Sequence, residues 1–223
     1  FYQNKPIPKL ILISHDFEEK KLLSVTFSKK EKRKIKIIKP QKGERQKIIN
    51  HALENSKNAL QRYQNNLLSN KKNLLLLQKV FQLDKAPKRI EIYDNSHIQG
   101  SYAVGAMVVA TEEGLDKGEY RKFNIKSAKT NDDFAMMNEV IERRFKKISK
   151  NQSFDRSKYP DIILIDGGRG QYTSTKKALD KLEITDVKII SIAKGEKRNA
   201  GREKFYTNKN KPYLFKPNDP MLF

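Results

Sequence analysis

Cysteine is absent from the sequence, and histidine is scarce, with three residues among 223. A chain without cysteine can form neither disulfide bonds nor thiolate zinc sites. The histidines His15, His51 and His97 are scattered along the sequence, which argues against a histidine-rich metal cluster. These absences exclude disulfide-stabilised and thiolate zinc proteins.

Long apolar runs are also missing. No stretch approaches the roughly 18 uninterrupted apolar residues that a membrane-spanning helix needs. The first residues lack the basic, apolar and small-residue order of a signal peptide. We therefore expect a soluble cytoplasmic protein with no membrane partner. The chain begins with Phe1 rather than Met, which favours a piece of a longer protein.

The formal net charge of +21 at pH 7 is the strongest global feature that is present. An excess of Lys and Arg favours an anionic partner, nucleic acid above all, because contacts to phosphate release counterions and supply most sequence-independent affinity. Lys, Asn and Ile are all abundant, however, and an AT-rich coding sequence would raise all three without selection for binding. Charge alone favours nucleic acid without establishing it.

Basic residues are concentrated in the first part of the chain. Residues 1–88 carry 21 Lys and Arg against 7 acids, whereas residues 89–223 carry 26 against 19. The first part predicts two strands, "KLILIS" and "KRKIKIIKP", and then a long amphipathic helix over 43–83 that the polar stretch "NNLLSNKKN" could bend or split. We interpret 1–88 as a basic α+β segment, its helix as a packing strut, and predict a domain boundary at residue 88.

The second part, 89–223, changes character. Its pattern predicts strands over 89–97, 101–113 and 119–126, a helix over 131–148, a strand over 160–166, a helix over 171–182 and a strand over 187–195. Three antiparallel strands followed by alternating helix and strand indicate an α/β fold. The predicted fold is a ribonuclease H-like mixed five-stranded sheet with flanking helices.

In two predicted strands an aspartate ends a row of apolar residues. In "PDIILIDGGRGQ" a continuous apolar run leads to Asp166, which is typical of a central strand covered on both faces. In "IEIYDNSH", Asp94 shares a face with Ile90 and Ile92. Carboxyl ends of strands in open α/β sheets line ligand-binding crevices. The alternative for Asp166 is the N-cap of the helix that begins near Gln171, and this stretch favours neither.

If the two strands lie adjacent and parallel, Asp94 and Asp166 meet in that crevice. Their repulsion would be relieved by a hard divalent ion such as Mg²⁺ or Mn²⁺, which prefers oxygen ligands. Two such ions about 4 Å apart could hydrolyse a phosphodiester. Asp133, in the first turn of its helix, is a candidate further ligand or outer-shell acid. Lys194 follows the last strand, and we interpret it as a surface lysine rather than a phosphate contact.

The sequence resembles the C-terminal nuclease half of the UvrC family, a component of excinuclease ABC in bacterial nucleotide excision repair. The resemblance is carried in order and spacing by "IEIYDNSHIQGSYAVGAMVV", "DDFAMMNEVIERRF", "PDIILIDGGRGQ", "AKGEKR" and "GREKFY", and it covers nearly the whole chain. It implies a ribonuclease H-like endonuclease that cuts DNA on the 5′ side of a lesion, with metal help, in a complex with UvrB. Asp94 and Asp166 match the family's catalytic aspartates, and Asp133 matches a third acid.

The family completes its site with a histidine in a helix after the "PNDP" region, and this chain stops at Phe223 before that helix. None of the three histidines matches that position, so we expect metal and DNA binding with weak or absent incision by this chain alone. An alternative is an incomplete remnant that binds DNA or repair partners without cutting. A weaker alternative is another ribonuclease H-like enzyme, such as a junction resolvase.

Overall fold

The chain divides into two compact units, residues 1–65 and 66–223. The computed structural model describes residues 2, 4–98, 101–129, 132–149, 158–195, 202–216, 219 and 222. Within these residues no helix is both long and apolar enough to cross a membrane. The sequence-based boundary at residue 88 stays a prediction.

The first unit pairs two short strands in parallel. β1 (Leu10–Leu12) and β2 (Lys36–Ile38) form a two-stranded sheet, and α1 (Lys20–Lys30) connects them. The sequence pattern predicted both strands but missed α1, because no residue of this helix is buried. Instead, two serine hydroxyls join it to the chain that enters β2: Ser24 donates to the Ile35 carbonyl at 2.6 Å, and the Ile35 N–H donates to Ser28 at 2.9 Å.

The long helix α2 (Glu44–Phe81) begins in the first unit and ends in the second. It follows Gly43, whose φ of +75° lies in the left-handed region that glycine adopts without strain. The helix runs through the polar stretch at 65–73 without a break. Its helical character is therefore confirmed over nearly the predicted range, and the split is not observed.

A mixed sheet organises residues 66–223. Its strand order is β10-β9-β8-β7-β3-β4-β5, and β6 also pairs with β4. The strands are β3 (Arg89–Ile98), β4 (Ser101–Thr111), β5 (Gly114–Leu115), β6 (Arg121–Asn124), β7 (Ile162–Asp166), β8 (Lys188–Ala193), β9 (Lys204–Tyr206) and β10 (Tyr213–Leu214). The predicted α/β class and its five main strands are confirmed. The structure adds β5, β9 and β10, which at two or three residues are too short to show a sequence period.

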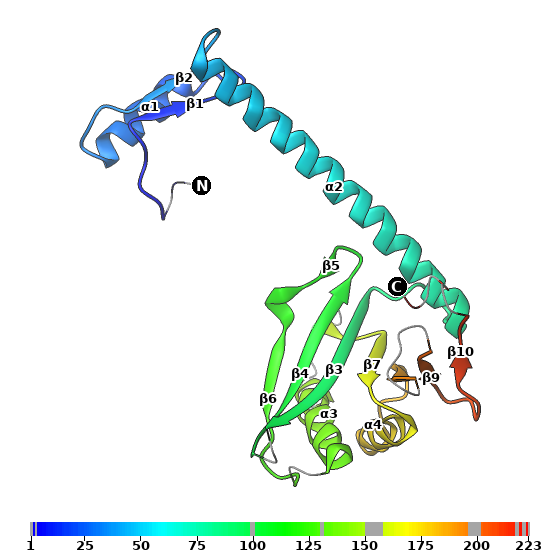
Figure 1. The fold of residues 1–223 in the computed structure, drawn as a ribbon. Coiled ribbons are helices and arrows are strands. Elements are labelled where there is room, and N and C mark those ends of the chain that lie inside the picture. Colours follow the sequence, from blue (N-terminus) through cyan, green and yellow to red (C-terminus); the bar gives the residue numbers. More distant parts are fainter. Residues whose placement is uncertain are drawn as a thin grey trace. The chain divides into compact units, whose positions relative to one another are not determined.

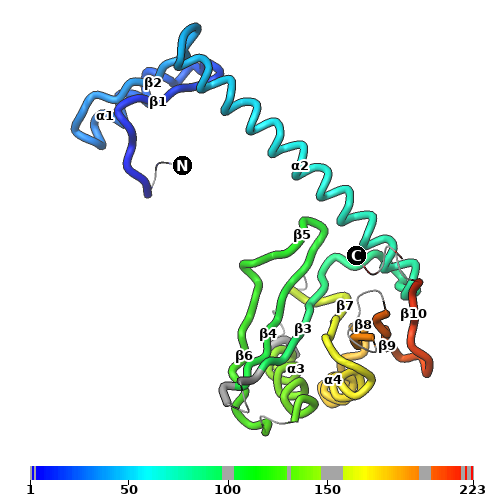
Figure 2. The backbone as a smooth tube through the Cα atoms, viewed as in Figure 1, coloured from blue at the N-terminus to red at the C-terminus, as the bar shows by residue number. Residues whose placement is uncertain are grey.

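The central strands run parallel although they are distant in sequence. β7 lies between β3 and β8 and is parallel to both, whereas β4 is antiparallel to β3. Figure 2 shows β3 and β7 side by side in the trace. Because β7 is an inner strand, its apolar run lacks the alternation of a half-exposed strand.

Both faces of this sheet are covered. Helices α3 (Asp133–Ser149) and α4 (Arg169–Lys181) lie together on one face, as Figure 1 shows. They bury a core with side chains from the sheet that includes Tyr93, Met137, Val140, Ile163, Ile165 and Leu179. The other face packs on the end of α2, where Phe81 meets Ile90, Ile162, Ile190 and Phe205 of the sheet. Each such side chain contributes about 1.5–3 kcal/mol on burial, and together they fix the strand ends.

Candidate active site

Three neighbouring strands carry charged residues at one edge of the sheet: Asp94 within β3, Asp166 at the end of β7 and Lys194 directly after β8. The parallel register pairs Ile92 with Leu164 and Tyr93 with Ile165, so Asp94 and Asp166 follow side by side. Both continue the alternate positions that carry Ile90 and Ile162, which face the α2 side. The predicted adjacency of these two strands is confirmed, and it brings the two carboxylates to one edge.

The negative charges of the three acids interact. The pKa of Asp94 is raised, first by partial burial and then by the negative charge of Asp166. Asp133 adds a smaller push in the same direction, while a backbone hydrogen bond from Asn95 and the charge of Lys194 oppose it. Like charges disfavour ionisation of their neighbours in this way only at short range. All three predicted acids therefore lie at the same edge.

Lys194 is the cation of this edge. It follows β8 at the position that continues the row of Ile190 and Ile192, and its Nζ lies 3.0 Å from Asp166 Oδ2. Its side chain is 65% exposed, so it is a surface lysine as predicted, but it is directed to the acid. Sequence reasoning gave Lys194 no role in the site, although the alternate positions of its strand pointed to this face.

The capping alternative for Asp166 is wrong. Helix α4 begins at Arg169 with Gly168 at its N-cap, and no side chain caps its N-terminus. The capping role belongs to α3 instead, where Asp132 Oδ1 accepts the N–H groups of Phe134 and Ala135 at 3.1 and 2.9 Å. Because Asp132 caps this helix, the carboxylate of Asp133 is not needed for that purpose.

Two amide side chains hold Asp133 in place from opposite sides. Its backbone carbonyl accepts Asn95 Nδ2 at 3.4 Å and Gln171 Nε2 at 3.2 Å. Asn95 follows Asp94 on β3, and Gln171, which is 8% exposed, lies in the first turn of α4. We call this pair the amide clamp. It ties the start of α3 to β3 next to Asp94 and to the first turn of α4, and sequence reasoning missed it.

The glycines after Asp166 permit close packing at this edge. A Cβ at Gly167 would lie 2.4 Å from Gln171 Cγ, and a Cβ at Gly170 would lie 2.4 Å from Phe134 Cε1. A larger residue at Gly167 would displace Gln171, and one at Gly170 would displace the Phe134 ring. This agrees with the interpretation of the glycines as tight turning rather than as a phosphate cradle.

The carboxylates of Asp94 and Asp166 suit a hard cation, although they form only a small group of possible ligands. Carboxylate oxygens are the ligands that Mg²⁺ and Mn²⁺ prefer, and Mg²⁺ is usually held by one or two carboxylates together with water. Among the described residues, no three acidic, histidine or cysteine side chains are grouped closely enough to hold one ion. The buried oxygens Asn95 Oδ1 and Gln171 Oε1 also have no hydrogen-bond partner within that part of the chain. The edge therefore offers the Asp94 and Asp166 pair rather than a closed cage.

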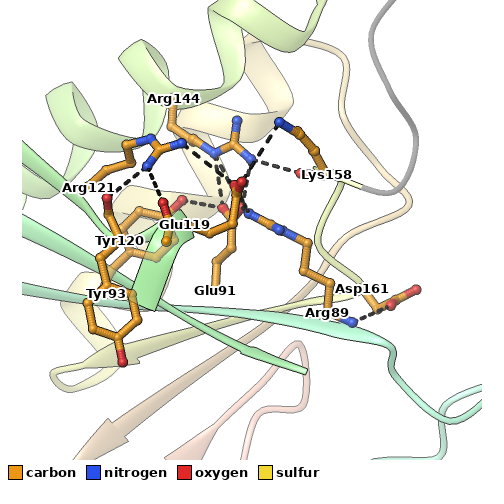
Figure 3. A network of polar contacts seen from close by, with 10 residues as sticks. Arg89, Glu91, Tyr93, Glu119, Tyr120, Arg121, Arg144, Lys158 and Asp161 are labelled. Carbon is orange, nitrogen blue, oxygen red and sulfur yellow. Dashed lines mark hydrogen bonds and ion pairs between the residues drawn. The ribbon is translucent and has the colours of Figure 1, made fainter. Parts of the chain in front are cut away.

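A buried network of charged residues is centred on Glu91, three residues before Asp94 on β3, as Figure 3 shows. Glu91 is 0% exposed and accepts Arg144 Nη2 at 2.7 Å, Arg89 Nη2 at 3.0 Å and the Tyr93 hydroxyl at 2.6 Å. Burial and the charge of Glu91 raise the pKa of the Tyr93 hydroxyl well above its usual range. Burial alone would lower the pKa of Arg144, but Glu91 outweighs it and raises it. The network fastens α3 to β3.

Family models and curated proteins match this chain. The family model described as the UvrC RNAse H endonuclease domain matches residues 78–223, and the UvrC Ribonuclease H-like domain model matches residues 1–63. The UvrABC system protein C of Maricaulis maris is 45% identical over the whole chain, and that of Chelativorans sp. is 44% identical. The chain spans 36% of the length of each of these relatives.

A solved structure of Ciona intestinalis endonuclease V in complex with inosine-containing DNA is also similar. It aligns with 49% of this chain and 46% of its own, with 16% identity and a TM-score of 0.36. This likeness is too distant to carry an argument about the site. The family matches are sufficient by themselves, and the chain belongs to the UvrC family, including its RNase H endonuclease domain.

Proposed function

We propose that this chain is the nuclease part of a UvrC protein and hydrolyses a DNA phosphodiester on the 5′ side of a lesion during nucleotide excision repair. The observation that carries the proposal is the register of β3 and β7, which sets Asp94 beside Asp166 at one sheet edge. Family membership adds the reaction class, since the matching domain is an endonuclease.

Asp94 and Asp166 are proposed to hold Mg²⁺ or Mn²⁺, with Asp133 as a further ligand or outer-shell acid. When bound, such an ion lowers the pKa of its water and neutralises charge on the phosphate. Metal binding needs Asp94 in its ionised form, which burial and the charge of Asp166 disfavour by raising its pKa, and a bound cation would offset that cost. The Lys194 ammonium, 3.0 Å from Asp166 Oδ2, would supply positive charge at this edge for a phosphate oxygen.

DNA and UvrB are the proposed partners. The net charge of +21 favours a polyanion, and the names of the relatives place them in the UvrABC system. An anionic cluster at one edge of a strongly basic chain suits catalysis on phosphate better than binding alone, since unneutralised carboxylates repel the backbone.

Cleavage by a chimeric protein tests the proposal. This segment would replace the matching segment of the Maricaulis maris UvrABC system protein C, which covers all of it. Incision of a lesion-containing duplex with Mn²⁺ and the partner proteins is then compared for the chimera, Asp94→Asn, Asp166→Asn and the control Asp180→Asn. Asp180 is an exposed α4 residue paired with Lys176.

We expect each site substitution to slow 5′ incision by about 100-fold or more, which corresponds to the several kcal/mol that a catalytic metal supplies. Asp180→Asn should cut like the unchanged chimera. If the chimera binds DNA and UvrB but none of the proteins cuts, the chain is a binding remnant and the nuclease proposal fails.

A further inference from the structure

Phe134 is an exposed aromatic residue at the acid edge. It is the second residue of α3, directly after Asp133, and it is 53% exposed. Single exposed apolar side chains are common on protein surfaces, and Phe134 is distinguished from the others by its place directly after Asp133. The proposed reaction does not use this side chain, because it has no polar atom.

The Phe134 ring packs against Gly170, which has no side chain. A Cβ at Gly170 would lie 2.4 and 2.5 Å from Phe134 Cε1 and Cζ, so the ring packs directly on the first turn of α4. The carbonyl of Phe134 accepts the Ser174 hydroxyl at 2.7 Å, which fixes its backbone to the same helix. One side of the ring is therefore supported while about half of the residue remains open to solvent.

An open groove of about 550 Å³ continues from the ring along α3. Cationic side chains that line it are Lys126, Arg143 and Lys146. Its two acids are engaged: Glu139 accepts the backbone N–H groups of residues 126–128 at 2.8–2.9 Å, and Glu142 bonds to Lys181 at 2.9 Å. The same acids also pair with two of the cations, Glu139 with Arg143 and Glu142 with Lys146, each at 3.2 Å. The groove thus has the size of a small-ligand site, and its lining carries one more basic than acidic side chain.

We propose that Phe134 stacks on the base of an unpaired nucleotide that flanks the scissile phosphate, with the sugar-phosphate backbone of that nucleotide in the groove beside α3. Aromatic rings bind unpaired bases by stacking regardless of sequence, which suits an enzyme that acts at varied sites. The inference rests on the proposed nuclease function and adds to it a subsite for one nucleotide.

The chain contains no tryptophan, so Phe134→Trp introduces a single fluorescent reporter at this position. An unpaired oligonucleotide, added with Ca²⁺ in place of Mn²⁺, should quench this fluorescence as a base stacks on the indole. The matched control is Leu115→Trp, an exposed position on β5 that is 61% exposed. Inorganic polyphosphate, which has charge but no bases, should quench neither. Quenching by polyphosphate, or equal quenching at both positions, would overturn the stacking proposal.

Incision by the chimera supplies an independent readout. Phe134→Leu should raise KM for the DNA substrate about 10-fold, within the range measured for single base-stacking contacts, and Phe134→Tyr should restore it. If Asp94→Asn abolishes incision while Phe134→Leu leaves KM unchanged, the subsite proposal fails and the nuclease proposal stands. If Asp94→Asn cuts normally, the proposed function itself fails.

Discussion

At the scale of single residues, the site is a balance of like charges. Asp94 is partly buried beside Asp166, and its pKa is raised for both reasons. A carboxyl group with a raised pKa in the folded state binds its proton more tightly there than in the unfolded chain. Its ionisation therefore opposes folding, and the sheet edge holds an electrostatic cost that a bound cation would relieve.

Asp94→Asn should stabilise the chain near neutral pH. Asparagine keeps the shape and removes the charge, so the gain is present at pH 7, decreases as the pH falls through the raised pKa of Asp94, and vanishes below its ordinary value. Solvent screening limits it to under about 1 kcal/mol. Urea unfolding at several pH values measures it. A variant that is less stable than the parent at pH 7 would contradict this account.

Glu91 presents the opposite case, because its charge is fully buried and fully paired. Glu91→Gln keeps the size but leaves Arg89 and Arg144 without their anion, and we expect a loss of about 3–5 kcal/mol in the free energy of unfolding. Glu119→Gln is the matched control, since Glu119 is partly exposed and lies farther from its cations. Its loss should stay under about 1 kcal/mol in the same urea experiment.

At the scale of elements, the position of α3 depends on the amide clamp of Asn95 and Gln171. The clamp joins the start of α3 to β3, which carries Asp94, and to α4, which follows Asp166 in the chain. Sequence patterns predicted α3, α4 and the strands because their apolar periods are long. They did not predict the clamp, because a glutamine in a first turn has no distinctive spacing. They missed α1 for a related reason, since serine hydroxyls rather than apolar residues fasten it.

Gln171→Met should weaken the site without unfolding the chain. Methionine fills a similar volume but cannot donate to the Asp133 carbonyl, so we expect about a 10-fold loss in Mn²⁺ affinity, as for other residues that position ligands. Isothermal titration measures the affinity. The control is Gln78→Met, another glutamine that donates to a backbone carbonyl, that of Asp84, away from the acids.

A double-mutant cycle separates positioning from general structure. If Gln171 acts through Asp133, adding Gln171→Met to Asp133→Asn should cost little more affinity than Asp133→Asn alone. Fully additive losses would mean that the glutamine affects the site by another route.

At the scale of the second unit, residues 66–223, the C-terminal end of α2 belongs to the core beneath the sheet. The Phe81 ring centroid lies 5.3 Å from that of Tyr213 and 6.2 Å from that of Phe205. Phe81→Ala should lower the free energy of unfolding by about 3–5 kcal/mol, because it leaves a cavity among buried side chains. Leu75→Ala, at an exposed position of the same helix, should cost far less. Thermal unfolding of both variants measures the two losses, and equal losses would contradict the core position of Phe81.

The β3 and β7 register brings together two aspartates that are far apart in the sequence and are therefore synthesised at different times. β3 can pair with β4 as soon as that hairpin leaves the ribosome, but Asp166 is made 72 residues after Asp94. At 5–20 residues per second this takes about 4–14 s. During that interval one edge of β3 has no partner, and edge strands are prone to pair with other chains. Asp94 and Asp166 are therefore brought together only when β7 pairs with this open edge of β3.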